Sequence, residues 1–257
     1  MTELERCLEF VARMADRAAA QKVRSEHGVA LLAPDFPDVW SRNYLFVERS
    51  DDVSAAELAA EVDAIFEPLH LRHRKVELFD AGAGDRLEPG FRELGWKGEC
   101  DVIMTWKRPP DRAADTALVD EASVEDLVPA WAESWQRDAN VPDEDVARQL
   151  VENKRTLATA VETRFFAARV EGTVASYCEL YSDGQVAQIE NVLTLERFRN
   201  RGLARATVSR ALTEARDADH ELIFLIADRD DWPKELYRKL GFDEVGRIWE
   251  FLRSPTR

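Results

Sequence analysis

The sequence is poor in cysteine and lacks long apolar runs. Its three cysteines, Cys7, Cys100 and Cys178, are far apart, odd in number and outside any CxxC pair, which argues against a disulfide framework and a zinc knuckle. No stretch approaches the roughly 18 apolar residues of a membrane span, and charged residues interrupt the region from Met1 to Met14 where a signal peptide would have its apolar core. We therefore expect a cytoplasmic protein without a membrane segment.

Positive charge is also scarce. Lys and Arg number 35 against 50 Asp and Glu, which gives a formal net charge of −15. Nucleic-acid binding depends on basic surface, so this balance disfavours a nucleic-acid partner, and it disfavours an anionic membrane for the same reason. The four histidines show no metal-ligand spacing with acids or cysteines, so no metal is expected, and His70 and His73 are expected on the surface.

Apolar residues, by contrast, are plentiful. They make up 45% of the 257 residues, enough for the cores of two compact domains. A stretch over residues 107–120 carries a Pro pair and weakly patterned charge between two strongly apolar regions. The sequence therefore predicts two domains, residues 1–110 and residues 111–257.

The two parts repeat one pattern. GFRELGW at residues 90–96 aligns with LYRKLGF at residues 236–242, an offset of 146 residues. The same offset, without a gap, aligns predicted strands 43–48, 75–79 and 97–108 with predicted strands 189–194, 221–225 and 243–254, and predicted helix 54–69 with predicted helix 200–215. We interpret this as a duplicated strand, helix, strand, helix, strand unit.

Further elements complete each half. Helices are predicted over residues 3–20, 123–133 and 143–159, a strand over residues 28–32, and a hairpin from strands 163–170 and 174–181 joined at Glu171-Gly172. A hairpin that leads into a strand-helix-strand crossover predicts an α/β (α+β) fold, with a mixed, mostly antiparallel sheet flanked by helices in each half. The segment from Asp80 to Asp85 loosely resembles a dinucleotide turn but lacks a third Gly and any basic residue, so we predict a turn with Asp85 as a helix cap.

Arginines cluster in the segment from Leu193 to Arg205. A predicted strand ends there, four arginines follow, and Gly202 stands just before a long helix. Unpaired backbone N–H groups and the positive end of a helix dipole favour a pyrophosphate at such a place, and Gly lets the ligand approach closely. The alternative is a solvated basic helix start that pairs with neighbouring acids.

These residues resemble a known family. Residues 199–204 (RNRGLA) fit the R/Q-x-x-G-x-G/A signature of the GNAT (Gcn5-related N-acetyltransferase) superfamily, and residues 236–242 resemble its L-Y-x-x-L-G-F segment. The resemblance covers about residues 123–253, and the duplication extends it more weakly to residues 43–108. The whole chain therefore resembles a tandem GNAT protein.

The resemblance implies acetyl-CoA as cosubstrate. In this family the signature strand would bind the pantetheine arm, the amides of the loop and helix start would hold the pyrophosphate, and a Tyr would protonate the leaving thiolate. On this sequence those roles fall to Val192, Leu193 and Thr194 for the arm, to Arg199, Asn200, Arg201, Gly202, Leu203 and Ala204 for the pyrophosphate, and to Tyr237 for the proton. Asp230 stands where the family pattern has an Asn that contacts the arm.

The general base has more than one candidate. Glu190 lies on the signature strand, where a carboxylate often serves as base in the family, but it could equally be a structural acid. Asp228, Asp230 and Asp231 are alternative acids, and Asp231 could instead cap a helix that opens at Trp232.

The N-terminal half lacks the chemical residues. At the offset of 146, Ala56 stands opposite Gly202 and Phe91 opposite Tyr237, and Asp51 and Asp52 precede the loop that replaces the arginine cluster. Carboxylates there would repel phosphate. We predict that this half binds no CoA and supports the fold or walls the acceptor cleft.

Together these features favour an N-acetyltransferase in which an amine attacks the thioester directly in a ternary complex. The alternative is a catalytically silent acyl-CoA sensor or interaction module. The acidic composition favours a cationic acceptor, a small-molecule amine or a lysine side chain, although it also serves solubility. The sequence names neither the acceptor nor an oligomeric state.

Overall fold

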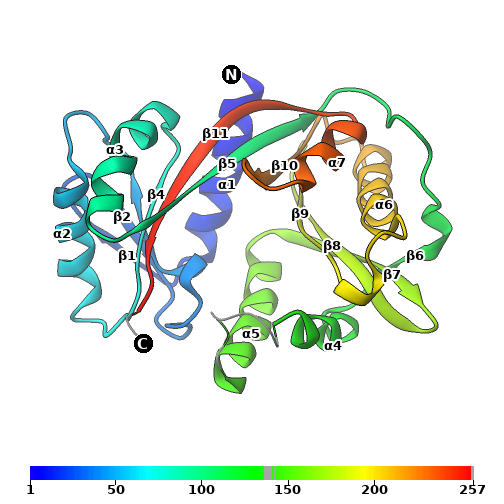
Figure 1. Cartoon of the computed structure of the whole chain (residues 1–257), viewed down its shortest axis with the longest axis horizontal. Helices are drawn as coiled ribbons and strands as arrows, with labels where there is room; N and C mark the ends of the chain where they lie inside the picture. Colours follow the sequence, from blue (N-terminus) through cyan, green and yellow to red (C-terminus); the bar gives the residue numbers. More distant parts are fainter. Residues whose placement is uncertain (136–140, 142, 256–257) are drawn as a thin grey trace. The chain divides into compact units, whose positions relative to one another are not determined.

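The chain forms two compact units, and the computed structural model describes residues 1–135, 141 and 143–255 (Figure 1). The first unit comprises residues 1–10, 103–227 and 231–245; the second comprises residues 11–102, 228–230 and those from 246 onward. Helix α1 (Glu3–Ala18) and strands β5 (Lys97–Trp106) and β11 (Phe242–Arg253) each contribute several residues to both units. Within the described residues, no helix combines the length and the apolar character needed to cross a membrane.

The sheet of the first unit has five successive strands in the order β10-β9-β8-β7-β6. These are β6 (Val119–Ala122), β7 (Glu162–Val170), β8 (Thr173–Asp183), β9 (Val186–Thr194) and β10 (Leu222–Asp228). Neighbouring strands are antiparallel except β9 and β10, which are parallel. The predicted hairpin joins β7 to β8, and both of its turn residues, Glu171 and Gly172, have positive φ (50° and 80°), as the tightest hairpin turns require.

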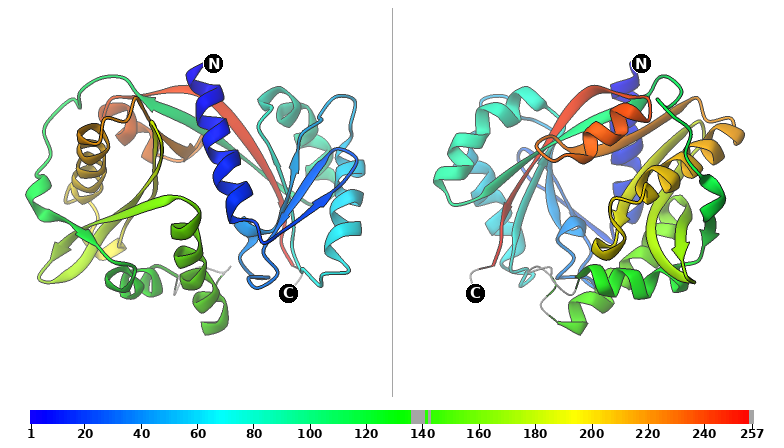
Figure 2. Two further views of the ribbon diagram at one scale, coloured as in Figure 1. Left: turned by 180° about the vertical axis from the view of Figure 1, so that it is seen from behind. Right: turned by 45° about the vertical axis from the view of Figure 1, so that its right-hand side comes forward.

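Helices cover both faces of this sheet, as can be followed in Figure 2. They are α4 (Val124–Trp135), α5 (Glu144–Ala160), α6 (Leu203–Asp217) and α7 (Pro233–Lys239). Neighbouring side chains of a strand point to opposite faces. On β8, Tyr177 packs edge-on against Trp131 of α4, whereas the Cys178 sulfur lies 3.5 Å from the Thr207 carbonyl oxygen of α6. Thus α4 and α6 lie on opposite sides of the sheet.

The second unit repeats this plan on a smaller scale. Its strands β1 (Gln21–Arg24), β2 (Gly28–Leu32), β3 (Tyr44–Val47) and β4 (Arg74–Leu78) are followed in the sheet by β11. Only β3 and β4 are parallel. Helices α2 (Ala55–Phe66) and α3 (Ala81–Glu93) complete it, and the Phe91 ring of α3 stacks on Phe251 of β11 at 4.2 Å between centroids. Among the residues that the structure describes, three short 3-10 helices lie in connections: η1 (Trp40–Arg42), η2 (Thr116–Leu118) and η3 (Glu196–Phe198).

The order of elements predicted from the repeat is present in both halves of the chain. An antiparallel pair, a crossover helix and a parallel strand occur as β2-β3-α2-β4 and again as β8-β9-α6-β10, and each is followed by a helix and a long strand. The last strand of the chain, however, does not stay with its own half. Residues 249–253 of β11 pair antiparallel with residues 74–78 of β4 inside the second unit.

Two local predictions are wrong. His73 was expected on the surface but is fully buried: its Nε2 lies 2.9 Å from the Asn43 carbonyl oxygen, and burial lowers its pKa to about 4. Asp85 was expected to cap α3, but the helix begins one turn earlier and Asp80 caps it, accepting the Ala83 N–H at 3.0 Å. Asp85 instead accepts a hydrogen bond from the Trp249 indole.

Candidate functional site

The site begins where two parallel strands of the first unit stop pairing. Among the described residues, β9 and β10 pair from Val186 and Leu222 to Ile189 and Leu225. Both strands continue beyond this point, β9 to Thr194 and β10 to Asp228. The edge of β9 that faced β10 therefore becomes available to a ligand over its last residues.

A bulge turns this end of β9. Tyr177 of β8 lies opposite Leu193, but Glu179 lies opposite Glu190, so two residues of β9, Asn191 and Val192, oppose one residue of β8. Asn191 has φ 51°, a left-handed conformation that Asn tolerates better than most residues. The bulge re-aims the backbone of residues 192–194, all three of which line a cavity.

The start of α6 presents backbone N–H groups to the same cavity. Gly202 is its N-cap residue with φ 77°, and no side chain of the described residues caps the helix there. The first N–H of α6 that finds a helical partner is that of Ala206, which donates to the Gly202 carbonyl at 3.1 Å. The N–H groups of the first turn and the positive end of the helix dipole thus remain to receive an anion.

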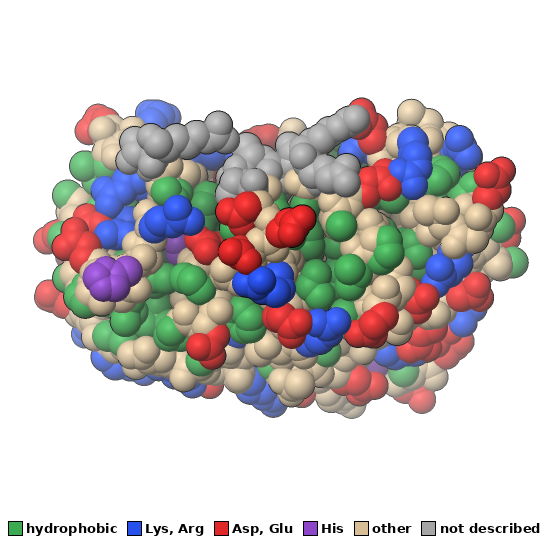
Figure 3. Space-filling model, turned by 90° about the horizontal axis from the view of Figure 1, so that it is seen from below, with side chains coloured by type: hydrophobic (Ala, Val, Ile, Leu, Met, Phe, Trp, Pro, Cys, Tyr) green, Lys and Arg blue, Asp and Glu red, His purple; other side chains and the backbone are tan. Residues whose placement is uncertain are grey.

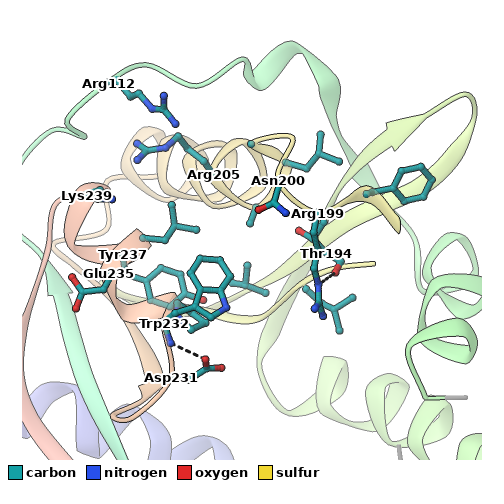
Figure 4. Close-up of a pocket in the computed structure, with 18 residues that line it drawn as sticks. Arg112, Thr194, Arg199, Asn200, Arg205, Asp231, Trp232, Glu235, Tyr237 and Lys239 are labelled. Carbon is teal, nitrogen blue, oxygen red and sulfur yellow. Dashed lines mark hydrogen bonds between the residues drawn. The ribbon is translucent and has the colours of Figure 1, made fainter. Parts of the chain in front are cut away.

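The cavity has a volume of about 880 Å³ and lies between the end of β9, the start of α6 and helix α7 (Figure 4). Four cationic side chains line it, against two acidic ones, Asp231 and Glu235. Of the cations, Arg205 pairs with Asp111 at 2.7 Å, and Arg199 Nε donates to the Thr194 carbonyl oxygen at 3.4 Å. The other two are Arg112 and Lys239. The lining thus carries an excess of positive charge in a chain whose net charge is −15.

Tyr237 of α7 also lines the cavity and is 6% exposed. Its ring packs edge-on against Phe242, and its hydroxyl makes no hydrogen bond to the residues that the structure describes. Burial, and after it the nearby Glu190 carboxylate, raises the pKa of Tyr237 above its usual value. The phenol therefore keeps its proton well into the alkaline range and can donate it to a ligand.

Glu190 lies on β9 just beyond the end of the paired region and does not line the cavity itself. Its carboxylate accepts a hydrogen bond from the Gln188 amide at 2.5 Å. Burial raises the pKa of Glu190 to about 7; the Asn191 backbone N–H opposes this shift, and the charge of Glu179 adds to it. A carboxylate with such a pKa can both accept and release a proton near neutral pH.

Most of the residues predicted for a cofactor meet at this cavity. Its lining includes Val192, Leu193, Thr194, Arg199, Asn200, Gly202, Leu203 and Ala204, and Tyr237 joins them. Arg201 does not line it, because its guanidinium lies over the Phe198 ring at 5.5 Å. Asp230 is also elsewhere: it belongs to the second unit and lines another cavity, of about 590 Å³, with Asp228 and Cys100.

The sequence did not single out several other lining residues. Arg112 comes from the linker after β5, and Lys239 from the last turn of α7, so only the folded chain brings their charges to the α6 start. Trp232 lines the cavity while 66% exposed, an exposure that its sequence neighbours do not reveal. A large exposed indole beside the start of α6 offers a flat apolar surface to a ligand.

One cluster in the second unit has metal-binding residue types. Potential ligand atoms of Glu26, His27 and Glu61 lie within 4.8 Å of one another. The His27 ring already contacts the Glu61 carboxylate, and the His27 backbone N–H donates to the same carboxylate at 3.3 Å. These contacts account for the cluster without an ion.

Comparison with known proteins agrees with this geometry. Residues 124–242 match the model of the Acetyltransferase (GNAT) family. No curated protein sequence matches the chain. The fold is similar to that of a functionally unknown conserved protein from Staphylococcus epidermidis ATCC 12228, with a TM-score of 0.67 and 14% identity over 92% of this chain and 94% of that one.

Two further solved structures are similar to this chain in fold. A GCN5-related N-acetyltransferase from Kribbella flavida gives a TM-score of 0.62 at 17% identity and covers 98% of this chain and 96% of its own. A tandem GNAT protein from the clavulanic acid biosynthesis pathway gives a TM-score of 0.54 at 14% identity, over 91% of this chain and 82% of that one. At such identities the likeness concerns the fold, and it confirms the predicted fold class.

Proposed function

We propose that this chain, whose residues 124–242 match the model of the Acetyltransferase (GNAT) family, transfers an acetyl group from acetyl-CoA to a primary amine. The observation that carries the proposal is the uncapped start of α6 at Gly202, which opens into a cavity lined by four cations. Backbone N–H groups and arginines together are the donors that a diphosphate requires.

Acetyl-CoA would occupy the cavity in a defined direction. Its diphosphate would lie at the amides of residues 199–204, with Arg112, Arg205 and Lys239 adding positive charge for the phosphates. Its pantetheine arm would follow the free edge of residues 192–194, in the manner of an added strand. This places the sulfur toward Tyr237, while Trp232 covers the apolar part of the arm.

The proposed reaction is a direct transfer. An acceptor that arrives as an ammonium ion first loses one proton to solvent. The neutral amine nitrogen then attacks the thioester carbonyl carbon and forms the new C–N bond, Glu190 takes a proton from this nitrogen, and the C–S bond breaks. Tyr237 stabilises the leaving thiolate by hydrogen bonding and supplies its proton. Because the pKa of Tyr237 is raised, full proton transfer is favourable only to a thiolate that is itself made more basic by the same buried environment.

The raised pKa of Glu190 predicts a pH dependence. A base must be ionised to accept a proton, so kcat/KM should fall as the pH drops below about 7, where Glu190 becomes protonated. Glu190→Gln should lower kcat/KM by roughly 100-fold or more and remove this acidic limb. The measurement is a pH profile of CoA release for both proteins. If kcat/KM of Glu190→Gln still falls below about pH 7 as in the native protein, another group is the base.

A sensor that binds acyl-CoA without turning it over is the second candidate. The same cavity would serve it, and the two functions differ only in whether an amine reaches the thioester. A thiol-release assay over a panel of small amines and lysine peptides separates them. Binding of acetyl-CoA without release from any acceptor would favour the sensor.

The acceptor is proposed to be a cationic amine, either a small molecule or a lysine side chain. The net charge of −15 attracts cations in general. Acidic side chains are interspersed with basic ones on the face shown in Figure 3, so on that face the charge is spread out. The negative net charge would therefore help a cationic acceptor to approach, but it would not select one acceptor over another.

The N-terminal half is proposed to bind no acetyl-CoA. The start of α2, which stands where α6 stands in the other half, is occupied by its own side chains: Ser54 and Glu57 form a capping box. The Arg86 guanidinium donates to the carbonyl oxygens of Val53 (2.8 Å) and Ser50 (2.5 Å) in the loop before it. Two of the α2 amides that correspond to the proposed anion site, those of Ser54 and Glu57, are thus already used.

Calorimetry should accordingly find one acetyl-CoA per chain. Replacing both Asp51 and Asp52 with Asn removes two exposed carboxylates from the α2 loop but leaves the capping box in place, so the stoichiometry should stay at one. A stoichiometry of two, in the native chain or in this variant, would show that the second half binds the ligand.

A further inference from the structure

A buried ion pair lies next to Glu190 in the first unit. Glu179 of β8 is 1% exposed, and its Oε1 accepts from Lys154 Nζ of α5 at 2.7 Å. The Tyr181 hydroxyl donates to the other oxygen, Oε2. Both carboxylate oxygens therefore have a donor, and Lys154 is itself held with its ammonium over the Trp131 ring at 5.9 Å.

The stability of the fold does not by itself explain the Lys154–Glu179 ion pair. Taking two charges out of water is unfavourable, and apolar residues of similar volume often stabilise a fold as well or better. What the arrangement does accomplish is to hold a buried carboxylate at this place with a donor on each of its oxygens, Lys154 on one and Tyr181 on the other.

The register of the sheet places that charge directly against Glu190. Glu179 and Glu190 are paired across β8 and β9, so their side chains leave the sheet on the same face, with Cβ atoms about 5 Å apart. Like charges in this position repel each other. The bulge at residues 191 and 192 produces this pairing, since without it Glu179 would face a different residue of β9.

We propose that Glu179 acts through Glu190: its charge, fixed by Lys154, makes Glu190 a stronger acceptor of protons than its surroundings alone would. Glu179 is in this sense a positioning residue, and it need not touch either substrate. The inference rests on the proposed role of Glu190 as base, which it deepens by naming what tunes that base.

The other groups around Glu190 are consistent with this role. On its own strand, Gln188 and the Asn191 N–H donate to the Glu190 carboxylate and favour its ionised form. Lys154 of α5 also favours the ionised form of Glu190. Tyr237 of α7 is neutral and adds no charge next to Glu190. Of the neighbouring charges, Glu179 favours the protonated form and has a larger effect than Lys154.

The two charges therefore oppose each other at Glu190, which makes the test sharp. Glu179→Gln removes the repulsion and leaves the Lys154 cation, so the acidic limb of kcat/KM should move to lower pH by about one unit. The matched control is the double variant K154M/E179Q, which removes both charges and should return the limb to within about 0.5 unit of the native position. Thermal unfolding checks that both variants fold.

Two outcomes would overturn the inference. One is an acidic limb of kcat/KM that lies at the same pH in Glu179→Gln as in the native protein. The other is a limb that moves as far in the double variant as in Glu179→Gln. If Glu179→Gln does not fold, Glu179→Asp serves instead. Asp is one methylene shorter than Glu, so it keeps the negative charge but holds it farther from Glu190. The acidic limb should then move in the same direction by a smaller amount.

A direct titration keeps this test separate from that of the proposed reaction. In protein carrying ¹³C-labelled glutamate carboxyls, the Glu190 signal, assigned by its loss in Glu190→Gln, should titrate at lower pH in Glu179→Gln. If Glu190→Gln retains full activity while this titration shifts as expected, the proposed base is wrong and the coupling of the two carboxylates stands. If the signal does not shift, the coupling itself is wrong, whatever the kinetics show.

Discussion

Replacing Gly202 with valine is expected to weaken acetyl-CoA binding by about 100-fold or more, which corresponds to about 2.7 kcal/mol. Gly202 has φ 77°, and an added Cβ would meet no atom within 4 Å because it would project into open space at the cavity. A branched side chain there would take the place of the phosphate and would also strain the left-handed backbone that presents the α6 amides.

Gly172→Val is the matched control for Gly202→Val. Gly172 has nearly the same conformation, φ 80°, with no atom within 4 Å of an added Cβ, but it lies in the β7–β8 turn and does not line the cavity. Both substitutions should lower the melting temperature by similar amounts, and only Gly202→Val should abolish binding in calorimetry. Equal affinities of the two variants would contradict an anion site at this helix start.

Removal of the Tyr237 hydroxyl should affect turnover far more than binding. Tyr237→Phe is expected to reduce kcat by roughly 100-fold or more and to leave the Kd for acetyl-CoA near that of the native protein. The Tyr237 hydroxyl makes no hydrogen bond to a described residue, so its loss should cost the fold little. Stopped-flow or steady-state thiol release, together with calorimetry, measures the two effects separately.

Tyr44→Phe provides a control for the loss of a buried phenol. Tyr44 is 7% exposed, similar to Tyr237, but it belongs to the second unit and does not line the cavity. It should retain native turnover. If Tyr237→Phe is as active as Tyr44→Phe, another group, or water, protonates the leaving thiolate.

Much of the site could be predicted because its central elements are local in sequence. A strand end, a Gly with positive φ and a helix start follow one another within residues 193–205, and such a segment presents its unpaired N–H groups wherever it folds. The same holds for Tyr237, whose motif is a single short helix and its flanking glycine. The repeat likewise predicted the order of elements, since each element of one half supported the assignment in the other.

The parts that escaped prediction depend on contacts between distant residues. The pairing of Glu179 with Glu190 requires the bulge, and a shift of one residue would have turned one of the two side chains to the other face. The Arg112 side chain reaches the cavity from a linker that has no pattern of its own. His73 is buried because Trp40 and Phe66 pack on its ring, and neither contact can be read from the helix end that it follows.

The exchange of strand residues gives both halves of the chain a structural reason to persist. The second unit includes Trp249 to Arg253, which pair with β4, and Glu250, which holds the buried Lys75 ammonium at 2.8 Å. The first unit in turn includes residues 1–10 and 103–106. Neither half is therefore a separable module. A gene that lost the N-terminal repeat would also lose residues 1–10 of the first unit and the β4 partner of residues 249–253, so the fold alone favours keeping both repeats.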